Sequence, residues 1–182
     1  MNRSYSSFFY CLFLVIAASF VLVANDIFAQ SGTKEKILYQ CLPCGSKCDT
    51  ITFRQPGECP HCRMELVKKL SYNMGSIDPS RICSYLESHP NVLLLDVRTK
   101  EEFEGKADPD YGTLKNAVNI PVQQLESRLS QLNAYKNREI IVYCSHSQRS
   151  PRAVYVLLQN GFTKVTNMTG GLSVMKDKAC KK

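Results

Sequence analysis

The chain has 182 residues, 44% of them hydrophobic and 21% charged, which suits one ordinary globular domain plus a small module. The formal net charge is +7, but the basic residues are scattered without a run of five or six like charges. This pattern argues against a nucleic-acid-binding protein, and the positive balance favours small anionic ligands.

Residues 1–29 have the layout of a secretory signal peptide. Arg3 precedes an apolar run from Phe8 to Ala24, and a small residue, Ala29, marks the expected cleavage position. The apolar run is also at the lower limit of what spans a bilayer, so an uncleaved N-terminal anchor is the alternative. We expect the remainder to be exported, periplasmic or secreted, and free of the membrane once the signal is removed. Disulfides can form in such a compartment.

Residues 30–70 form a predicted cysteine module. Two C-x-x-C pairs, Cys41 with Cys44 and Cys59 with Cys62, are separated by fourteen residues. This spacing is typical of a zinc ribbon in which four thiolates hold a structural zinc ion. A segment this short buries little apolar surface, so the metal would supply most of the folding free energy. Cys48 is a fifth thiol without an assigned role.

Other readings of these cysteines stay open. The segment from Tyr39 to Leu66 resembles the small heavy-metal-binding modules attached to metal-transport proteins, which implies another soft metal such as copper. Disulfides are a further possibility. Cys59-Pro-His-Cys62 also resembles the redox pair of thioredoxin-like oxidases, but the surrounding residues lack the βαβ pattern that this pair requires.

A boundary around 71–75 separates the module from a second domain, residues 76–182. Asp78 and Pro79 are predicted to open its first helix, and Cys83 is expected to be inert core. Further along, apolar runs predict strands at 92–95, 117–120, 140–143 and 164–168. Amphipathic patterns and caps predict helices at 99–105, 122–132, 151–161 and shortly after 170. This alternation predicts an α/β fold with a parallel sheet and helices on both faces.

In such a fold the ligand site lies at the carboxyl ends of the strands, where Asp96, Arg98 and Cys144 fall. Cys144 opens a polar loop that leads into a helix, with Ser150 predicted as the N-cap. The N–H groups at the start of that helix, with Arg149 nearby, should favour the thiolate form of Cys144. Cys144 is therefore the predicted nucleophile.

Residues 76 to about 176 resemble a single rhodanese-like domain. The resemblance rests on four motifs: 95–98 with 101–103, 112–121, the loop 144–150, and the double glycine 170–171. Two departures stand out. Ser147 occupies a loop position where the family usually has glycine, and Met175 is the nearest candidate for the tryptophan that usually follows the double glycine.

The resemblance implies a sulfurtransferase that carries sulfane sulfur as a Cys144 persulfide, from a small anionic donor such as thiosulfate to a thiol, a protein thiol or cyanide. Arg149 would bind the donor's sulfonate oxygens, and Asp96 and Arg98 would support the loop from beneath. His146 is expected to face solvent, and Cys180 to be free in the C-terminal tail or, alternatively, to resolve the persulfide. The active loop comprises Ser145, His146, Ser147, Gln148 and Ser150.

Two alternatives differ in class. Phosphatases of the same fold use Cys-x5-Arg, whereas here only four residues separate Cys144 from Arg149, which favours sulfur over phosphate. The other alternative is a non-enzymatic, exported metal-handling or thiol-sensing protein.

Overall fold

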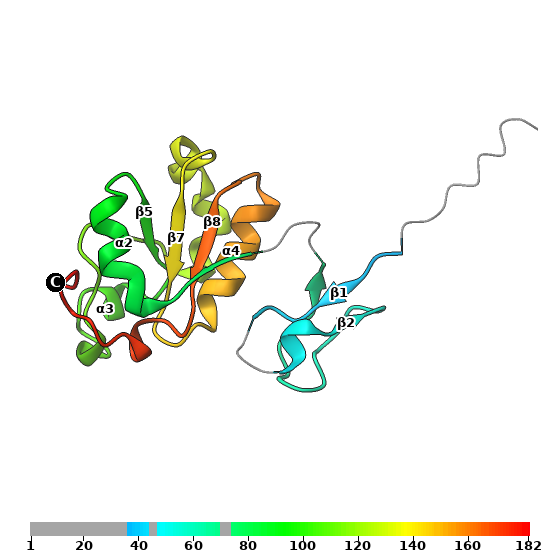
Figure 1. Cartoon of the computed structure of the whole chain (residues 1–182). Helices are drawn as coiled ribbons and strands as arrows, with labels where there is room; N and C mark the ends of the chain where they lie inside the picture. Colours follow the sequence, from blue (N-terminus) through cyan, green and yellow to red (C-terminus); the bar gives the residue numbers. More distant parts are fainter. Residues whose placement is uncertain (1–35, 44–46, 70–73) are drawn as a thin grey trace, which may run out of the picture. The chain divides into compact units, whose positions relative to one another are not determined.

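The computed structural model describes residues 36–43, 47–69 and 74–182 (Figure 1). The predicted signal peptide and Cys44 lie outside these ranges. Within them, no helix combines the length and apolarity needed to cross a bilayer. The described residues form a cysteine module and an α/β domain.

The cysteine module is built from three two-residue antiparallel strands in the order β2-β1-β3. A 3-10 helix, η2 (Lys47–Thr50), lies between the first two strands along the chain. Its strands are β1 (Tyr39–Gln40), β2 (Thr52–Phe53) and β3 (Val67–Lys68). The fully buried residues of its core are three cysteines and Leu66. Because sulfur atoms make up most of this core, apolar burial contributes little to its stability.

The α/β domain contains a five-stranded, fully parallel sheet in the order β4-β8-β7-β5-β6. The strands are β4 (Gly75–Ile77), β5 (Leu93–Asp96), β6 (Val118–Asn119), β7 (Ile140–Tyr143) and β8 (Val165–Met168). The predicted fold class is therefore confirmed. β4 was missed because its three residues include a glycine and contain no apolar run.

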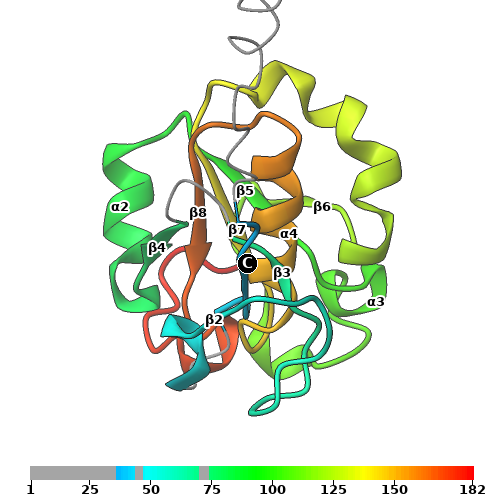
Figure 2. The same ribbon diagram turned by 90° about the vertical axis from the view of Figure 1, so that its right-hand side faces the viewer.

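Both faces of the sheet are covered, as Figure 2 shows, with α2 (Ile82–Ser88) on one side and α4 (Arg149–Gln159) on the other. Successive side chains of a strand point to opposite faces. Val142 accordingly packs in the core beneath α4, whereas Tyr143 packs in the core beneath α2. This explains why β5 and β7 read as continuous apolar runs rather than alternating ones.

The predicted helix starts are largely confirmed. Asp78 caps the 3-10 turn η3 (Pro79–Arg81), where its Oδ1 accepts the Ser80 N–H at 2.8 Å. A capping box between Thr99 and Glu102 opens α3 (Lys100–Phe103). The remaining 3-10 elements are η4 (Pro109–Tyr111), η5 (Val122–Gln124), η6 (Glu126–Tyr135) and η7 (Leu172–Val174).

The helix predicted over 122–132 is thus 3-10 rather than α. The Ser127 hydroxyl donates to the Gln124 carbonyl oxygen at 2.9 Å, and such local side-chain bonds compete with the regular α-helical pattern. Leu125 and Leu132 are nevertheless buried, so the predicted apolar face is present.

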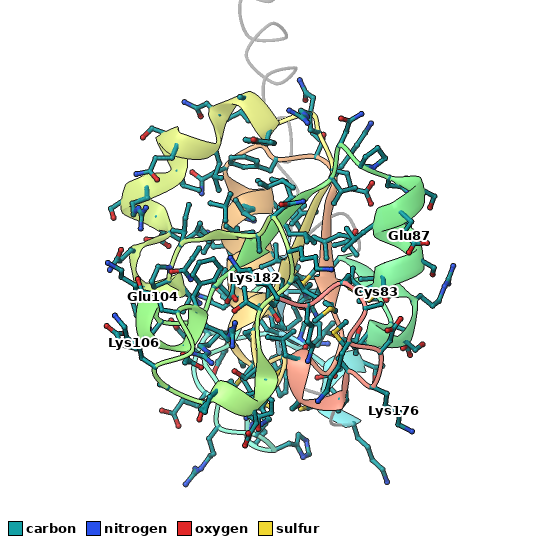
Figure 3. All side chains as sticks on the ribbon, turned by 90° about the vertical axis from the view of Figure 1, so that its left-hand side faces the viewer. Cys83, Glu87, Glu104, Lys106, Lys176 and Lys182 are labelled. Carbon is teal, nitrogen blue, oxygen red and sulfur yellow. A yellow bond between two sulfur atoms is a disulfide. The ribbon has the colours of Figure 1, made fainter. Side chains whose placement is uncertain are left out.

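The predictions for Cys83 and Cys180 were wrong in their chemistry. The two form a disulfide that links residues 97 positions apart, and Figure 3 shows the face of the molecule on which Cys83 lies. The C-terminal tail brings Cys180 there because Lys181 forms an antiparallel bridge with Leu114. In the chain-entropy view, a cross-link of this span stabilises the fold by about 5 kcal/mol.

Candidate active site

The loop that holds Cys144 leaves β7 and enters α4 two residues earlier than predicted. Gln148 is the N-cap residue and Arg149 begins the helix, so Ser150 lies in its first turn. The Ser150 hydroxyl does not cap the helix. It faces the reactive thiol instead, with 3.5 Å between Ser150 Oγ and Cys144 Sγ.

The environment of Cys144 favours its charged form. Burial, with only 1% of the residue exposed, raises the pKa of the thiol. Hydrogen bonds from the Ser150 hydroxyl and from the backbone N–H groups of Ser150, Arg149 and His146 act in the opposite direction. They outweigh burial, so the pKa of Cys144 is lower than that of an ordinary cysteine. The structure thus brings together a buried thiol and the donors that stabilise its anion.

The middle of the loop turns through a left-handed residue. Ser147 has φ of 57°, the conformation that its glycine-like position requires, at a cost of about 1 kcal/mol. Its hydroxyl oxygen accepts a hydrogen bond from Asn167 Nδ2 on β8 at 3.1 Å, which holds the turn in place. His146 is exposed, as predicted, and its Nε2 lies 3.1 Å from the Tyr111 hydroxyl.

The double glycine holds the loop from the other side. Gly171 has φ of 69°, and a Cβ there would collide with the carbonyl oxygens of Cys144 and Ser145. Those two carbonyls accept hydrogen bonds from Leu172 N–H at 3.0 Å and Ser173 N–H at 2.9 Å. The carbonyl oxygens of Cys144 and Ser145 are therefore hydrogen-bonded to the segment that follows the double glycine. The N–H groups of the loop remain available to donate to the sulfur.

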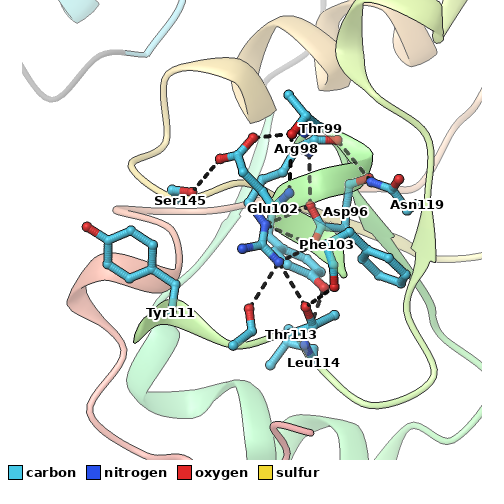
Figure 4. A network of polar contacts seen from close by, with 12 residues as sticks. Asp96, Arg98, Thr99, Glu102, Phe103, Tyr111, Thr113, Leu114, Asn119 and Ser145 are labelled. Carbon is cyan, nitrogen blue, oxygen red and sulfur yellow. Dashed lines mark hydrogen bonds and ion pairs between the residues drawn. The ribbon is translucent and has the colours of Figure 1, made fainter. Parts of the chain in front are cut away.

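Glu102 is a site residue that the sequence did not reveal. Its two carboxylate oxygens accept hydrogen bonds from Arg149, at 2.6 Å from Nη1 and 2.7 Å from Nη2. The Ser145 hydroxyl donates to the same carboxylate at 3.2 Å, and Figure 4 shows this contact in the surrounding network. The Arg149 guanidinium, above all, lowers the pKa of Glu102 to about 2. From the sequence, Glu102 belonged only to the capping box with Thr99 and to the 101–103 motif, and neither indicates its contacts with Arg149 and Ser145.

Asp96 and Arg98 form a buried ion pair at the end of β5. Neither side chain is exposed, and Arg98 Nη2 donates to Asp96 Oδ2 at 2.7 Å. The same Nη2 reaches the Gly112 carbonyl oxygen and Thr113 Oγ1, both at 3.0 Å. The pair also lies beside the residue that precedes the nucleophile, because Asp96 is paired in the sheet with Tyr143. This is the position expected for supporting the loop from beneath.

A second constellation lies in the cysteine module. The sulfur atoms of Cys41, Cys48, Cys59 and Cys62 are all within 4.8 Å of one another, and none of these four residues forms a disulfide. A tetrahedral zinc ion with Zn–S bonds of about 2.3 Å requires sulfur separations of about 3.8 Å, which this cluster can accommodate. Cys48, unassigned from the sequence, is thus part of the cluster, whereas Cys44 lies outside the described residues. The C-x-x-C spacing had favoured Cys44 as the fourth ligand, and the structure brings Cys48 to the cluster instead.

Together these features define an α/β domain with a buried cysteine thiol of lowered pKa held at the junction of a strand and a helix. The sequence profile of the rhodanese-like domain family matches residues 84–178. The chain therefore belongs to the rhodanese-like family.

Known proteins are similar over the same region. A protein named sulfurtransferase from Allochromatium vinosum is 29% identical over 99 residues, covering 54% of this chain and 85% of its own length. A tRNA uridine(34) hydroxylase from Buchnera aphidicola is 29% identical over 125 residues, covering 60% of this chain but only 38% of the relative. A crystal structure from Staphylococcus saprophyticus superimposes with a TM-score of 0.50 at 26% identity, covering 60% of this chain and all of the other.

The first prediction concerns the charge on Cys144. Ser150→Ala removes a hydroxyl that donates to the thiolate, a bond worth about 1.5 kcal/mol or more, so the pKa of Cys144 should rise. The pH dependence of Cys144 alkylation by iodoacetamide measures this shift. Ser84→Ala, which removes an exposed hydroxyl on α2, serves as the control and should leave the profile unchanged. A Ser150→Ala profile identical to that of the wild type would contradict the assignment.

The second prediction concerns Glu102. Its pKa falls from 4.5 in the unfolded chain to about 2, so its stabilising effect is complete above about pH 4.5 and is lost as the pH falls toward 2. Glu102→Gln should lower the free energy of unfolding by about 2 kcal/mol at pH 7, and the difference from wild type should shrink below pH 4.5. Denaturant titrations followed by circular dichroism measure both. The control is Glu101→Gln, an exposed neighbour on α3, which should have little effect at any pH. If the loss of unfolding free energy caused by Glu102→Gln were as large at pH 3 as at pH 7, the ion pair would not be its cause.

Proposed function

We propose that the α/β domain is a sulfurtransferase that carries sulfane sulfur as a persulfide on Cys144. The observation that carries this proposal is the buried thiol surrounded by N–H groups of its own loop, which lower its pKa. A persulfide is more acidic than a thiol, so the same donors suit the terminal sulfur of a persulfide anion even better.

The reaction follows from the thiolate. Cys144 Sγ attacks the outer sulfur of thiosulfate, a new S–S bond forms, and sulfite leaves with the electron pair of the bond that breaks. An acceptor thiolate then attacks the terminal sulfur, becomes a persulfide itself and releases the Cys144 thiolate. Cyanide as acceptor gives thiocyanate. Neither half-reaction needs an external oxidant or reductant.

We assign Arg149 a role as the fixed positive charge beside the sulfur. Its two Nη atoms are bound to Glu102, and its side chain remains 30% exposed. The pKa of Arg149 is raised first by Glu102 and also by the nearby Cys144, so it stays charged throughout turnover. The N–H groups of Arg149 that are not bound to Glu102 would then bind the sulfonate oxygens of thiosulfate. The net charge of +7 would help to attract this anion.

Sulfurtransfer is also the activity named for the relative from Allochromatium vinosum, most of whose length is matched. The hydroxylase relative is matched over 38% of its length, so its activity offers no comparable support for this chain.

We place the protein outside the cytoplasm, without nucleic acid as a partner and without membrane attachment after signal cleavage. The order of charged, apolar and small residues in 1–29 supports export. The Cys83–Cys180 disulfide supports it independently, because structural disulfides persist chiefly in oxidising compartments.

For the cysteine module we propose a structural zinc ion held by Cys41, Cys48, Cys59 and Cys62. Three of these residues are at most 2% exposed, and buried thiolates need a cation as partner. The fourth, Cys62, is partly exposed, and Met64 packs against the cluster. This open side favours one second candidate, in which the module carries a soft metal such as copper(I) for delivery.

The sulfurtransferase proposal is tested by mass. Intact mature protein treated with thiosulfate should gain one sulfur atom, because the Cys144 thiolate retains the outer sulfur of the donor. Cys144→Ser should gain none, and Cys48→Ser should gain as much as wild type because its thiol belongs to the other module. Absence of any gain in the wild type would refute the proposal.

The metal proposal is tested by native mass spectrometry and competition with a chelator. The purified protein should hold one zinc ion, and Cys48→Ser should bind it at least about tenfold more weakly because one thiolate is lost. Cys44→Ser is the matched comparison and should retain zinc. Loss of zinc from Cys44→Ser but not from Cys48→Ser would reverse the assignment, and preferential copper(I) loading with rapid transfer to a chelator would favour delivery.

A further inference from the structure

The Cys83–Cys180 disulfide lies in the wall of a surface pocket of about 330 Å³ that does not include the active loop. Cys83 is only 4% exposed, whereas Cys180 is partly exposed, so Cys180 is the more accessible residue of the pair. The other lining residues include Leu86, His89, Val92 and Lys115. The pocket therefore offers a small molecule apolar contacts, basic side chains and a disulfide within reach, although Glu87 adds one negative charge to its rim.

The disulfide attaches the C-terminal residues 180–182 to α2, and these residues are hydrogen-bonded to residues 111–115. Lys115 N–H donates to the Cys180 carbonyl oxygen at 2.9 Å, and Lys182 N–H donates to the Thr113 carbonyl oxygen at 2.8 Å. Lys181 Nζ donates to the Tyr111 carbonyl oxygen, also at 2.8 Å. These bonds depend on the tail staying in place, and the disulfide is its covalent attachment to α2.

Residues 111–114 in turn contact the catalytic framework. The Tyr111 hydroxyl lies 3.1 Å from His146 in the active loop. Thr113 Oγ1 accepts from the buried Arg98, and Leu114 N–H donates to the hydroxyl of Tyr143, the residue before the nucleophile, at 3.4 Å. A change in the tail can therefore reach the loop through direct contacts.

From this arrangement we propose that Cys83–Cys180 is a thiol-exchange site, reached through the pocket by a small dithiol, and that its reduction slows sulfur transfer at Cys144. A thiolate of the dithiol attacks Cys180 Sγ, and Cys83 leaves as a thiolate. The second thiol of the reagent then attacks the mixed disulfide and displaces Cys180. The protein gains two electrons and two protons, and the dithiol becomes a cyclic disulfide.

Thiol exchange and the resulting loss of the hydrogen bonds between the tail and residues 111–115 are tested on the native, full-length mature protein with dithiothreitol as the probe. Alkylation and peptide mapping should find Cys83 and Cys180 reduced while β5 and β7 keep their hydrogen-exchange protection. The amides of Lys115 and Lys182 should lose protection by at least about tenfold, because their acceptors move away. A disulfide that resists dithiothreitol until the domain unfolds, or unchanged protection after reduction, would overturn the proposal.

The effect on catalysis is measured with Cys180→Ser and, as a second variant, Cys83→Ser, because dithiothreitol would itself remove the persulfide sulfur. Both should form the Cys144 persulfide more slowly than wild type, within the roughly 2- to 30-fold range expected of remote coupling. Lys178→Ala, an exposed change in the same tail, is the control and should keep the wild-type rate. Equal rates in all four proteins would overturn the coupling.

The comparison of persulfide-formation rates rests on the proposed sulfurtransferase activity. The proposal of a thiol-exchange site and the proposed activity can nevertheless fail separately. A wild-type protein that forms no persulfide would refute that activity. The dithiothreitol and hydrogen-exchange measurements would still decide whether the disulfide can be reduced in the folded protein and whether it holds the tail in place.

Discussion

Holding a negative charge on a buried sulfur is the constraint on which the α/β domain depends. An anion at a site with 1% exposure loses most of its hydration, and that loss alone would keep Cys144 protonated. The first turn of α4 and the loop before it offset the loss, because their N–H groups are directed at the sulfur. A persulfide anion needs the same donors, so one arrangement suits both the nucleophile and the proposed intermediate.

The loop keeps this shape because each of its parts is held by a different element. Gly171 allows η7 to bind the loop carbonyls from outside, and Asn167 on β8 holds Ser147 in its left-handed conformation. Glu102 ties α3 to Arg149 and Ser145. It also completes the cap of its own helix through the Thr99 N–H, so one carboxylate fixes both α3 and the loop. Preorganisation of this kind avoids rearranging the donors when charge develops on the substrate.

The sequence predicted most of the domain because its local signals agree with its tertiary structure. The apolar runs of β5 and β7 and the capping box at Thr99 were all visible in the order of residues. What escaped prediction depends on distant parts of the chain. β4 has no pattern of its own and exists because β8 pairs with it.

Tertiary contacts also decide the chemistry of several side chains. Glu102 is separated from Arg149 by 47 positions, and Cys83 from Cys180 by 97, so neither pair has a local signature. Ser150 was predicted as the N-cap, but α4 begins at Arg149 and the Ser150 hydroxyl faces the Cys144 thiol. In the module, Cys48 joins the sulfur cluster because η2 positions it there, whereas spacing alone had favoured the C-x-x-C partner.

The sulfur atoms of one chain therefore have different tasks: a proposed nucleophile at Cys144, a thiol cluster suited to a metal, and a disulfide that fixes the tail. The burial of each sulfur and the groups that surround it, rather than the residue type, distinguish these tasks.

The most direct test of the central claim is a crystal structure of the protein after treatment with thiosulfate. The account predicts an additional sulfur bonded to Cys144 Sγ and directed into the loop, within hydrogen-bonding distance of its backbone N–H groups, with Glu102 still bound to Arg149. A modified Cys144 whose extra sulfur points away from those N–H groups, or a loop that must refold to admit it, would contradict the claim that the loop is built for an anionic sulfur.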